Sequence, residues 1–325
     1  MRIVSLLPAA TEILNAIGAG PSVVGVTHEC DFPPAVAGTP AVIRSRVDPS
    51  ADQAEIDRRV RALIERGESI YAVDAQLLET LAPDLIVTQD LCHVCAASPE
   101  DLAAALARLP ERLRPRVVTF TPRNLANVWQ GIRAIGDAAG HAAEADALAA
   151  RLAGRVAEIA ASVADVTRRP RVLCLEWFDP PFFGGHWVPE MVRMAGGIDV
   201  LGREGEPSVT VTWPKILAAQ PEVIVLMPCG YALARNLEIW RSTRLPAGWD
   251  ELPAVKTSRV YAVDGNGYFS RCGPRLADGV ALLASLFHPE RFETDAARAL
   301  SGEVAHAVKH VVAAANPAPR GLVAN

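Results

Sequence analysis

Three features are scarce in this chain of 325 residues: cysteine, long apolar runs and an excess of positive charge. Six cysteines are too few for a disulfide scaffold of this length, so we expect reduced thiols. No apolar run reaches the roughly 20 residues that a membrane-spanning helix needs. A net charge of −5, with acids and bases interspersed, offers no basic surface to nucleic acid or to an anionic membrane.

The first residues also lack the pattern of a secretory signal. The segment "MRIVSLLPAATEIL" has one arginine, and Pro8 and Glu12 follow before a signal-type apolar region can form. The sequence as it stands therefore predicts a cytoplasmic protein, and a periplasmic one if a leader has been removed.

Short apolar segments alternate with amphipathic ones along most of the chain. This alternation is typical of β-α-β units around mostly parallel sheets. We predict a helix over 10–19, with Thr11 as its N-cap, and further helices over 188–196, 213–220 and 274–287. The predicted strands are 2–7, 22–27, 69–73, 84–89 and 116–120 in the first half, and 171–177, 223–227 and 259–263 in the second.

The segment 124–167 separates the two halves and has no strand pattern. Gly140 divides it into a short helix and a long one that starts near Ala142. We therefore predict an α/β protein with two Rossmann-like lobes, each with a parallel-dominated sheet, joined by one long helix, with a ligand cleft between the lobes. The expected boundaries are 1–122 for the N-terminal lobe, 123–167 for the linking helices (backbone helix about 142–166), 168–292 for the C-terminal lobe and 293–325 for a C-terminal helix and tail.

Chemically versatile side chains follow the predicted strands. Five of the six cysteines come just after a strand, whereas Cys174 alternates with apolar residues inside one and is predicted to be core. In facing parallel sheets such positions converge on one cleft. The candidate metal ligands at these positions are Cys30, Cys92, Cys95, Cys229, Cys272, His28 and His186.

The motif "CHVC" leaves three interpretations open: unliganded loop thiols, a soft-metal or metal-cofactor site, or a redox pair. A shared metal site predicts that Cys92 and Cys95 lie close to at least one other candidate ligand or to His93. For His28 and His186, a ligand contact and a structural hydrogen bond are both open. We expect His288 to be structural, and His141, His306 and His310 to be solvated.

The aromatic residues gather at strand ends although they make up only 6% of the chain. Stacking on a flat ring system is a natural use for such a group, so we expect them to line the cleft and not the core. They are Trp177, Phe182, Phe183, Trp187, Tyr268 and Phe269.

Several segments resemble helical-backbone (class III) substrate-binding proteins, and most of all the cobalamin-binding members of the iron–siderophore, haem and corrinoid group. They are "SLLPAATEILNAIGAGPSVVGVTHECDFPP", "LLETLAPDLIVTQ", "FDPPFFGGHWVPEMVRMAGGIDVLG", "TWPKILAAQPEVIVL" and "GYFSRCGPRLADGVALL", and together they run from about residue 2 to residue 290. The resemblance implies non-catalytic binding of a metal-organic ligand between the lobes, cobalamin or another corrinoid first and haem or a ferric chelate next. It implies ligand contacts at Pro8, Ala9, His28, Asp31, Phe32, Asp90, Phe183, His186, Trp187, Tyr268, Phe269 and Arg271.

Two departures from this family leave an alternative open. Transport members carry a glutamate on each lobe that docks on an ABC permease, whereas Gln76 and Pro214 stand at the corresponding positions. The cysteines are the second departure. The alternative is a cytoplasmic metalloprotein, metallochaperone or enzyme that uses a Cys/His cluster on the same scaffold.

Overall fold

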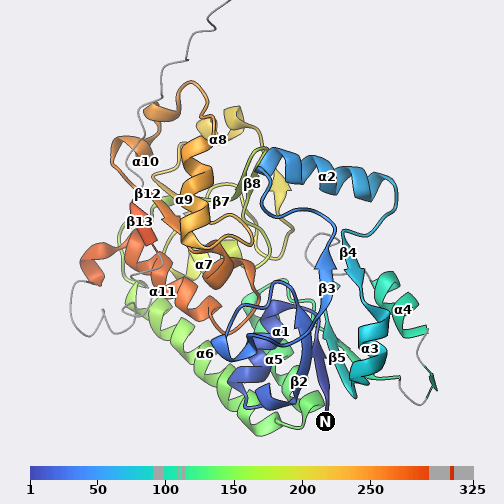
Figure 1. Cartoon of the computed structure of the whole chain (residues 1–325). Helices are drawn as coiled ribbons and strands as arrows, with labels where there is room; N and C mark the ends of the chain where they lie inside the picture. The colour runs from blue at the N-terminus through green and yellow to red at the C-terminus, as the bar shows by residue number, and fades with distance from the viewer. Residues whose placement is uncertain (91–98, 108–109, 112–113, 293–307, 311–325) are drawn as a thin grey trace, which may run out of the picture.

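Two separate β-sheets with helices packed around them form the molecule (Figure 1). This computed structural model describes residues 1–90, 99–107, 110–111, 114–292 and 308–310. The first sheet has the order β4-β3-β2-β1-β5-β6, and the second has the order β10-β8-β7-β11-β12-β13 with β9 beside β7. The predicted two-lobed α/β fold is therefore confirmed. In the described part of the chain, no helix combines the length and the apolarity required to cross a membrane.

The first sheet is parallel except at one edge, where β4 runs antiparallel to β3. Its central strands are short and fully buried, as expected for strands covered on both faces. The strands are Ile3–Ser5 (β1), Val23–Thr27 (β2), Ala41–Ser45 (β3), Tyr71–Val73 (β4), Leu85–Thr88 (β5) and Arg116–Thr119 (β6). The helices are Pro8–Ala16 (α1), Gln53–Glu65 (α2), Ala75–Leu81 (α3) and Pro99–Ala107 (α4), with short turns at Gly20–Ser22 (η1) and Pro34–Val36 (η2).

The second sheet is parallel at its centre and antiparallel at both edges. Its strands are Arg171–Phe178 (β7), Pro181–Phe183 (β8), Ile198–Asp199 (β9), Val209–Thr210 (β10), Val223–Leu226 (β11), Val260–Val263 (β12) and Val308–His310 (β13). Its helices are Val188–Met194 (α7), Trp213–Ala219 (α8), Leu233–Ser242 (α9), Pro253–Lys256 (α10) and Leu276–Phe287 (α11), with turns at Trp249–Glu251 (η4), Asn266–Ser270 (η5) and Pro289–Arg291 (η6). The strand β13 occupies three residues where we expected helix, and the rest of that expected helix lies outside the described residues.

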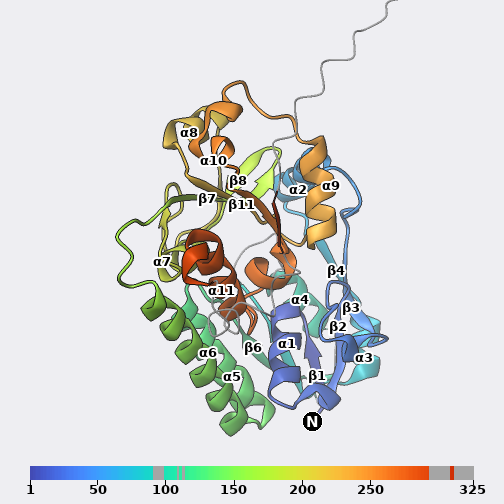
Figure 2. The same ribbon diagram turned by 90° about the vertical axis from the view of Figure 1, so that its left-hand side faces the viewer.

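Two antiparallel helices link the lobes. Helix α5 (Leu125–Ala139) ends at Gly140, whose φ of +76° is the left-handed conformation that glycine adopts without strain. Helix α6 (Ala142–Ser162) is one continuous helix, as predicted. Leu148, Leu152 and Val156 follow helical spacing and are buried on one face of α6, which packs on α5 and also contacts α7 and α11 (Figure 2).

The largest core cluster crosses from one lobe to the other. It includes Ile13 of α1 and Ile132 of α5, and continues through Leu148 of α6 to Met191 of α7 and Leu283 of α11. The two lobes are therefore packed on a shared apolar core in addition to being linked by the chain.

The start of α1 differs from the sequence-based expectation. The helix begins at Pro8, after Leu7, because proline lacks an N–H and has a helix-compatible φ, which suit it to the first helical position. Thr11 lies inside the helix and is fully buried, and its Oγ1 donates to Ser5 Oγ at 2.8 Å. The prediction of Thr11 as the N-cap was wrong.

Candidate functional site

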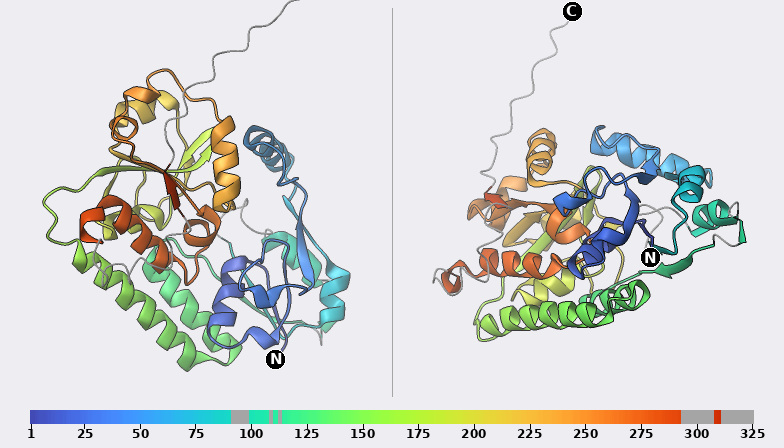
Figure 3. Two further views of the ribbon diagram at one scale, coloured as in Figure 1. Left: turned by 60° about the vertical axis from the view of Figure 1, so that its left-hand side comes forward. Right: turned by 60° about the horizontal axis from the view of Figure 1, so that its bottom comes forward.

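Loops that follow the strands of one sheet contact loops that follow the strands of the other. The first contact joins α1 and the segment after β2 to η5 and the start of α11. The second joins the N-terminus of α2 to the end of β7 and to α9, where α2 lies beside the second lobe (Figure 3). The candidate site therefore comprises these two junctions and the pocket beside the strand ends of the first lobe.

The first junction is a set of ion pairs that we call the interlobe ion cluster: Glu12 and Asp31 of the first lobe with Arg271 and Arg275 of the second. Arg271 donates from Nη1 to Glu12 Oε1 at 3.1 Å and to Asp31 Oδ1 at 2.5 Å. Arg275 donates from Nε and Nη2 to the two oxygens of Glu12, at 2.9 and 2.5 Å. One carboxylate thus joins two guanidinium groups across the junction.

The cluster is buried at its centre and open at its edge. The side chains of Glu12 and Arg271 are 2% and 6% exposed, whereas that of Asp31 is 61% exposed. Burial lowers the pKa of Arg271, but the bonds to Asp31 and Glu12 outweigh it and raise this pKa overall. Charges buried this deeply are tolerated only when they are paired, so the cluster holds the lobes in one relative position.

Aromatic rings extend the same junction. The guanidinium of Arg275 lies 4.3 Å from the ring centre of Phe32 and 5.8 Å from that of Tyr268. A methyl group built on Gly273 would lie 3.6 Å from the Cα of Ala9, so the turn before α11 sits directly against the start of α1. Ala9 itself is only 2% exposed and belongs to the core cluster that crosses the lobes.

The second junction, which we call the α2 bridge, is formed by the residues that begin α2. Gln53 is 3% exposed, and its Oε1 accepts from the N–H of Phe178 at the end of β7 at 2.9 Å. Arg235 of α9 donates from Nη2 to the carbonyl oxygens of Ser50 and Ala51, at 3.0 and 3.3 Å. The bridge therefore consists of hydrogen bonds to backbone groups on both lobes.

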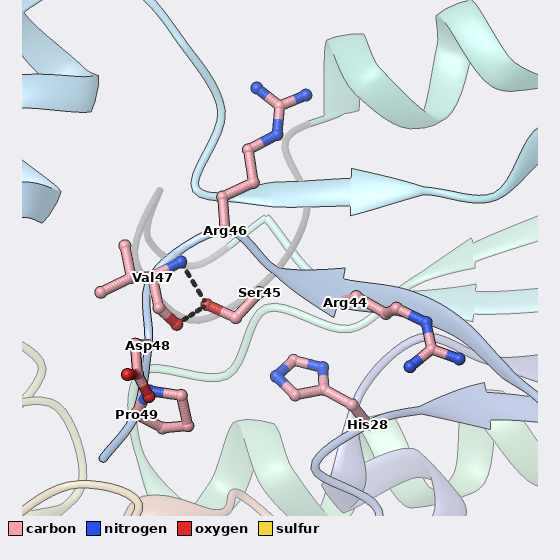
Figure 4. Close-up of a pocket in the computed structure, with 7 residues that line it drawn as sticks. All are labelled: His28, Arg44, Ser45, Arg46, Val47, Asp48 and Pro49. Atoms are coloured by element: carbon pink, nitrogen blue, oxygen red, sulfur yellow. Dashed lines mark hydrogen bonds between the residues drawn. The ribbon is translucent and has the colours of Figure 1, made fainter. Parts of the chain in front are cut away.

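A pocket of about 400 Å³ opens beside the first lobe's strand ends (Figure 4). His28 and Arg44 lie on one side of it, and Asp48 lies on the other. His28 Nδ1 is 3.1 Å from the carbonyl oxygen of Ile43, which fixes the imidazole against β3. Its volume lies within the range of small-molecule pockets. It is lined by His28, Arg44, Ser45, Arg46, Val47, Asp48 and Pro49.

The structure does not gather the candidate cysteines that it describes into a metal site. Cys30 lies 3.1 and 3.3 Å from the hydroxyls of Thr11 and Thr27, and burial raises the pKa of its thiol more than these bonds lower it. Cys229 is exposed and Cys272 is buried. Over residues 1–90, 99–107, 110–111, 114–292 and 308–310, no three His, Cys, Asp or Glu side chains are placed to hold a metal ion. Cys92, His93 and Cys95 lie outside the described residues, so their proximity to other ligands stays a prediction.

The expectation that the strand-end aromatics are not core residues is wrong for Trp187 and Phe269. They are 5% and 1% exposed, and both belong to the core cluster that crosses the lobes. Trp187 Nε1 donates to the carbonyl oxygen of Phe269 at 2.7 Å, so the indole is held inside the protein. Phe183 and Tyr268, each 9% exposed, also belong to core clusters, so the expectation is wrong for them as well. The aromatics follow strands, but helices α7 and α11 cover the side of the sheet toward which Trp187 and Phe269 turn.

Some aromatic residues remain accessible near the junctions, among them Phe182, which is half-buried and pairs with Trp177 across β7 and β8. Trp177 is half-buried and packs against the ring of Tyr231 at a centroid distance of 5.5 Å. Phe32 is 40% exposed. The rings of Trp177 and Phe32, one on each lobe, are the described aromatics best placed to meet a ligand.

The remaining predicted residues fall into structural and exposed positions. His288 is buried with Nε2 at 3.2 Å from the carbonyl oxygen of Gly196, as expected for a structural histidine, and Cys174 is buried in β7. His186 has a φ of +53° and packs against Trp187, and burial and then the charge of Arg123 lower its pKa. The positions that are exposed at the surface are Asp90, Gln76, Pro214 and His310.

Sequence reasoning missed Glu12, Arg275 and Gln53. For Glu12 a signal exists, because it is the only charged residue in the buried helix "PAATEILNA" and a buried charge needs a partner. No comparable signal marks Gln53, since its partner Phe178 lies 125 residues away in the sequence and is reached only through the fold.

Comparisons with known proteins agree with this geometry. Residues 3–266 match a family model described as periplasmic binding protein. An ABC transporter substrate-binding lipoprotein of Bacillus subtilis, itself uncharacterized, is 25% identical over 90% of this chain and 81% of its own length. The vitamin B12-binding protein of Vibrio cholerae is 24% identical over 86% of each chain.

A solved structure has the same fold. The periplasmic haem-binding protein RhuT from Roseiflexus sp. RS-1, in its apo form, aligns with a TM-score of 0.66 at 25% identity. The alignment covers 89% of this chain and 98% of that protein.

Proposed function

We propose, since this chain belongs to the periplasmic binding protein family, that it binds a metal-organic ligand, a corrinoid, between its two lobes and releases it chemically unchanged. The observation that carries the proposal is the pair of junctions, at which the loops that follow the strands of one sheet meet those that follow the strands of the other. In open α/β sheets, ligands bind beyond the carboxyl ends of the strands.

At the interlobe ion cluster the paired charges favour a corrinoid over haem, whereas Arg44 and Arg46 in the neighbouring pocket would suit either ligand. Haem carries two carboxylates, which need free cationic partners in a binding site. Arg271 and Arg275 are already neutralised by Glu12 and Asp31. A corrinoid presents neutral carboxamides, which are satisfied by hydrogen bonds alone. The relative from Vibrio cholerae, a vitamin B12-binding protein, supports this choice.

The accessible rings supply the apolar part of the proposed site. Trp177 from the second lobe and Phe32 from the first are available to pack on the faces and edges of a flat macrocycle. The 400 Å³ pocket beside His28 has the volume to take one side group of that macrocycle.

The proposal extends to transport. One relative is an ABC transporter substrate-binding lipoprotein and a protein of the same fold is a periplasmic haem-binding protein, and we propose a periplasmic location and an ABC transporter partner for this chain. Gln76 and Pro214 are exposed at the first turns of α3 and α8, and neither carries a charge. Docking on a permease would therefore use other contacts than a pair of glutamates.

Titration of the purified protein with cyanocobalamin and with haem, each followed by absorbance and by thermal melting, tests the proposal. We expect one corrinoid per chain, bound more tightly than haem and recovered unchanged. At a hundredfold excess over Kd the ligand should stabilise the fold by about 2.7 kcal/mol. A melting curve that neither ligand shifts would refute the proposal.

A further inference from the structure

Of the two polar atoms in the Gln53 carboxamide, the oxygen has a hydrogen-bond partner among the described residues and the nitrogen has none. Gln53 Oε1 accepts from the N–H of Phe178, and Nε2 is buried and donates to no atom of the described residues. Gln53 is only 3% exposed, so bulk water does not satisfy this donor. A buried N–H group without an acceptor costs about 1 to 3 kcal/mol. Native proteins avoid this cost at most positions, so an acceptor at this point is expected.

The surroundings of Gln53 fit a ligand group. Gln53 is the first residue of α2, whose leading amides have no partner within the helix. Phe178, which Gln53 contacts, directly follows Trp177, the half-buried ring that packs on Tyr231. A donor on the first lobe therefore lies at an interlobe contact whose second-lobe partner is the chain neighbour of Trp177.

Charge selects the type of acceptor. The carboxylate of Asp52 caps α2 by accepting from the N–H of Glu55, and the nearby Arg235 is paired with Glu238 at 2.9 Å. An anionic acceptor would meet the Asp52 carboxylate without a free cation to offset it. A neutral carbonyl oxygen would not be repelled by the Asp52 carboxylate.

We propose that Gln53 Nε2 donates a hydrogen bond to a carboxamide oxygen on the edge of the bound ligand, while the ligand ring packs on Trp177. This inference rests on the proposed function. It makes Gln53 a residue that both bridges the lobes and selects ligands with neutral carboxamide edges. It also accounts for the placement of an amide, and not a carboxylate, at the start of α2.

Two substitutions separate the ligand role from the bridging role. Gln53→Glu keeps an oxygen that accepts from Phe178 N–H but loses the donor, whereas Gln53→Met loses both. Gln76→Glu and Gln76→Met make the same changes at an exposed glutamine of α3 and serve as matched controls. The readout is the Kd for cyanocobalamin, measured by titration below the melting transition of each variant.

If Nε2 contacts the ligand, both Gln53 variants should bind cyanocobalamin about tenfold more weakly than the unaltered protein and the Gln76 variants. A loss in Gln53→Met alone would assign the effect to the Phe178 bond and overturn the inference, as would no loss in either variant. Titration with haem is a second measurement. Because haem carries carboxylates, Gln53→Glu should raise the Kd for haem more than Gln53→Met does. If the unaltered protein binds neither ligand, the proposed function itself fails, and this outcome is distinct from the others.

Discussion

Replacement of Glu12 by glutamine tests whether the interlobe ion cluster holds the fold together. Glutamine has the same shape, so the substitution removes the charge with little change in packing. Glu12 accepts three hydrogen bonds from two cations, and its side chain is only 2% exposed. We expect the variant to fold and to be clearly less stable.

The expected loss in the free energy of unfolding depends on which hydrogen-bond partners Arg271 and Arg275 keep in the variant. Loss of one partner of a buried ion pair costs about 3 to 5 kcal/mol when the other charge is stranded. Arg271 keeps Asp31 and the carbonyl oxygen of Glu29, and Arg275, with 19% of its side chain exposed, can turn toward water. The expected loss in the free energy of unfolding is therefore smaller, about 2 to 3 kcal/mol.

Urea unfolding followed by circular dichroism measures this loss, with Glu79→Gln, an exposed position on α3, as the control. Because the cluster is buried, the loss should persist in 0.5 M salt, where an exposed pair is screened, with a Debye length of about 4 Å. A loss no larger than that of Glu79→Gln would show that the cluster does not stabilise the fold and would refute the reasoning.

Two further experiments give separate checks. Trp187→Ala should cost about 3 to 5 kcal/mol in urea unfolding because the indole is core, whereas Phe32→Ala, at a 40% exposed ring, should cost less than about 1 kcal/mol; equal losses would contradict the burial. Burial raises the pKa of Asp199 to about 6, more than its bonds to the N–H groups of Leu201 and Gly202 lower it. A raised carboxyl pKa means that the folded state binds the proton more tightly than the unfolded state does. The free energy of unfolding should therefore decrease by up to about 3 kcal/mol as the pH rises from about 4 to about 6. Asp199→Asn should remove this contribution to the fall, and a variant with an unchanged pH profile would contradict it.

The sequence predicts the fold well because most of its strands and helices are marked by a local pattern of apolar residues. Strands such as 171–177 and 223–227 are apolar runs bounded by turns, and the long helix 142–162 is an uninterrupted helical pattern after Gly140. Most of the strands that escaped prediction are short or contain proline, such as β8 at Pro181–Phe183 and β9 at Ile198–Asp199, but β3 at Ala41–Ser45 has five residues and was missed as well. Short edge strands are defined by their neighbours and not by their own pattern.

The site is harder to predict, because position after a strand does not determine the direction of a side chain. Cys30 and Cys272 both follow strands, yet one contacts threonine hydroxyls and the other is core. Trp187 follows β8 and turns inward under α7. Arg271 and Asp31 were predicted as ligand contacts, and the structure pairs them with each other across the lobes. Such pairings join residues more than 200 positions apart and depend on the tertiary fold.

The two junctions and the linking helices together constrain how the molecule can open. The lobes are attached at three places: α5 and α6, the interlobe ion cluster and the α2 bridge. A rigid body attached at three points has no free hinge axis, because rotation about a line through two of them breaks the third. The α2 bridge consists of hydrogen bonds to backbone groups, whereas the interlobe ion cluster consists of ion pairs and the linking helices are continuous with both lobes, so we infer that the bridge is the attachment that opens. Exchange of a bound molecule would then be set by the rate at which one helix end detaches, and not by rotation of half the protein.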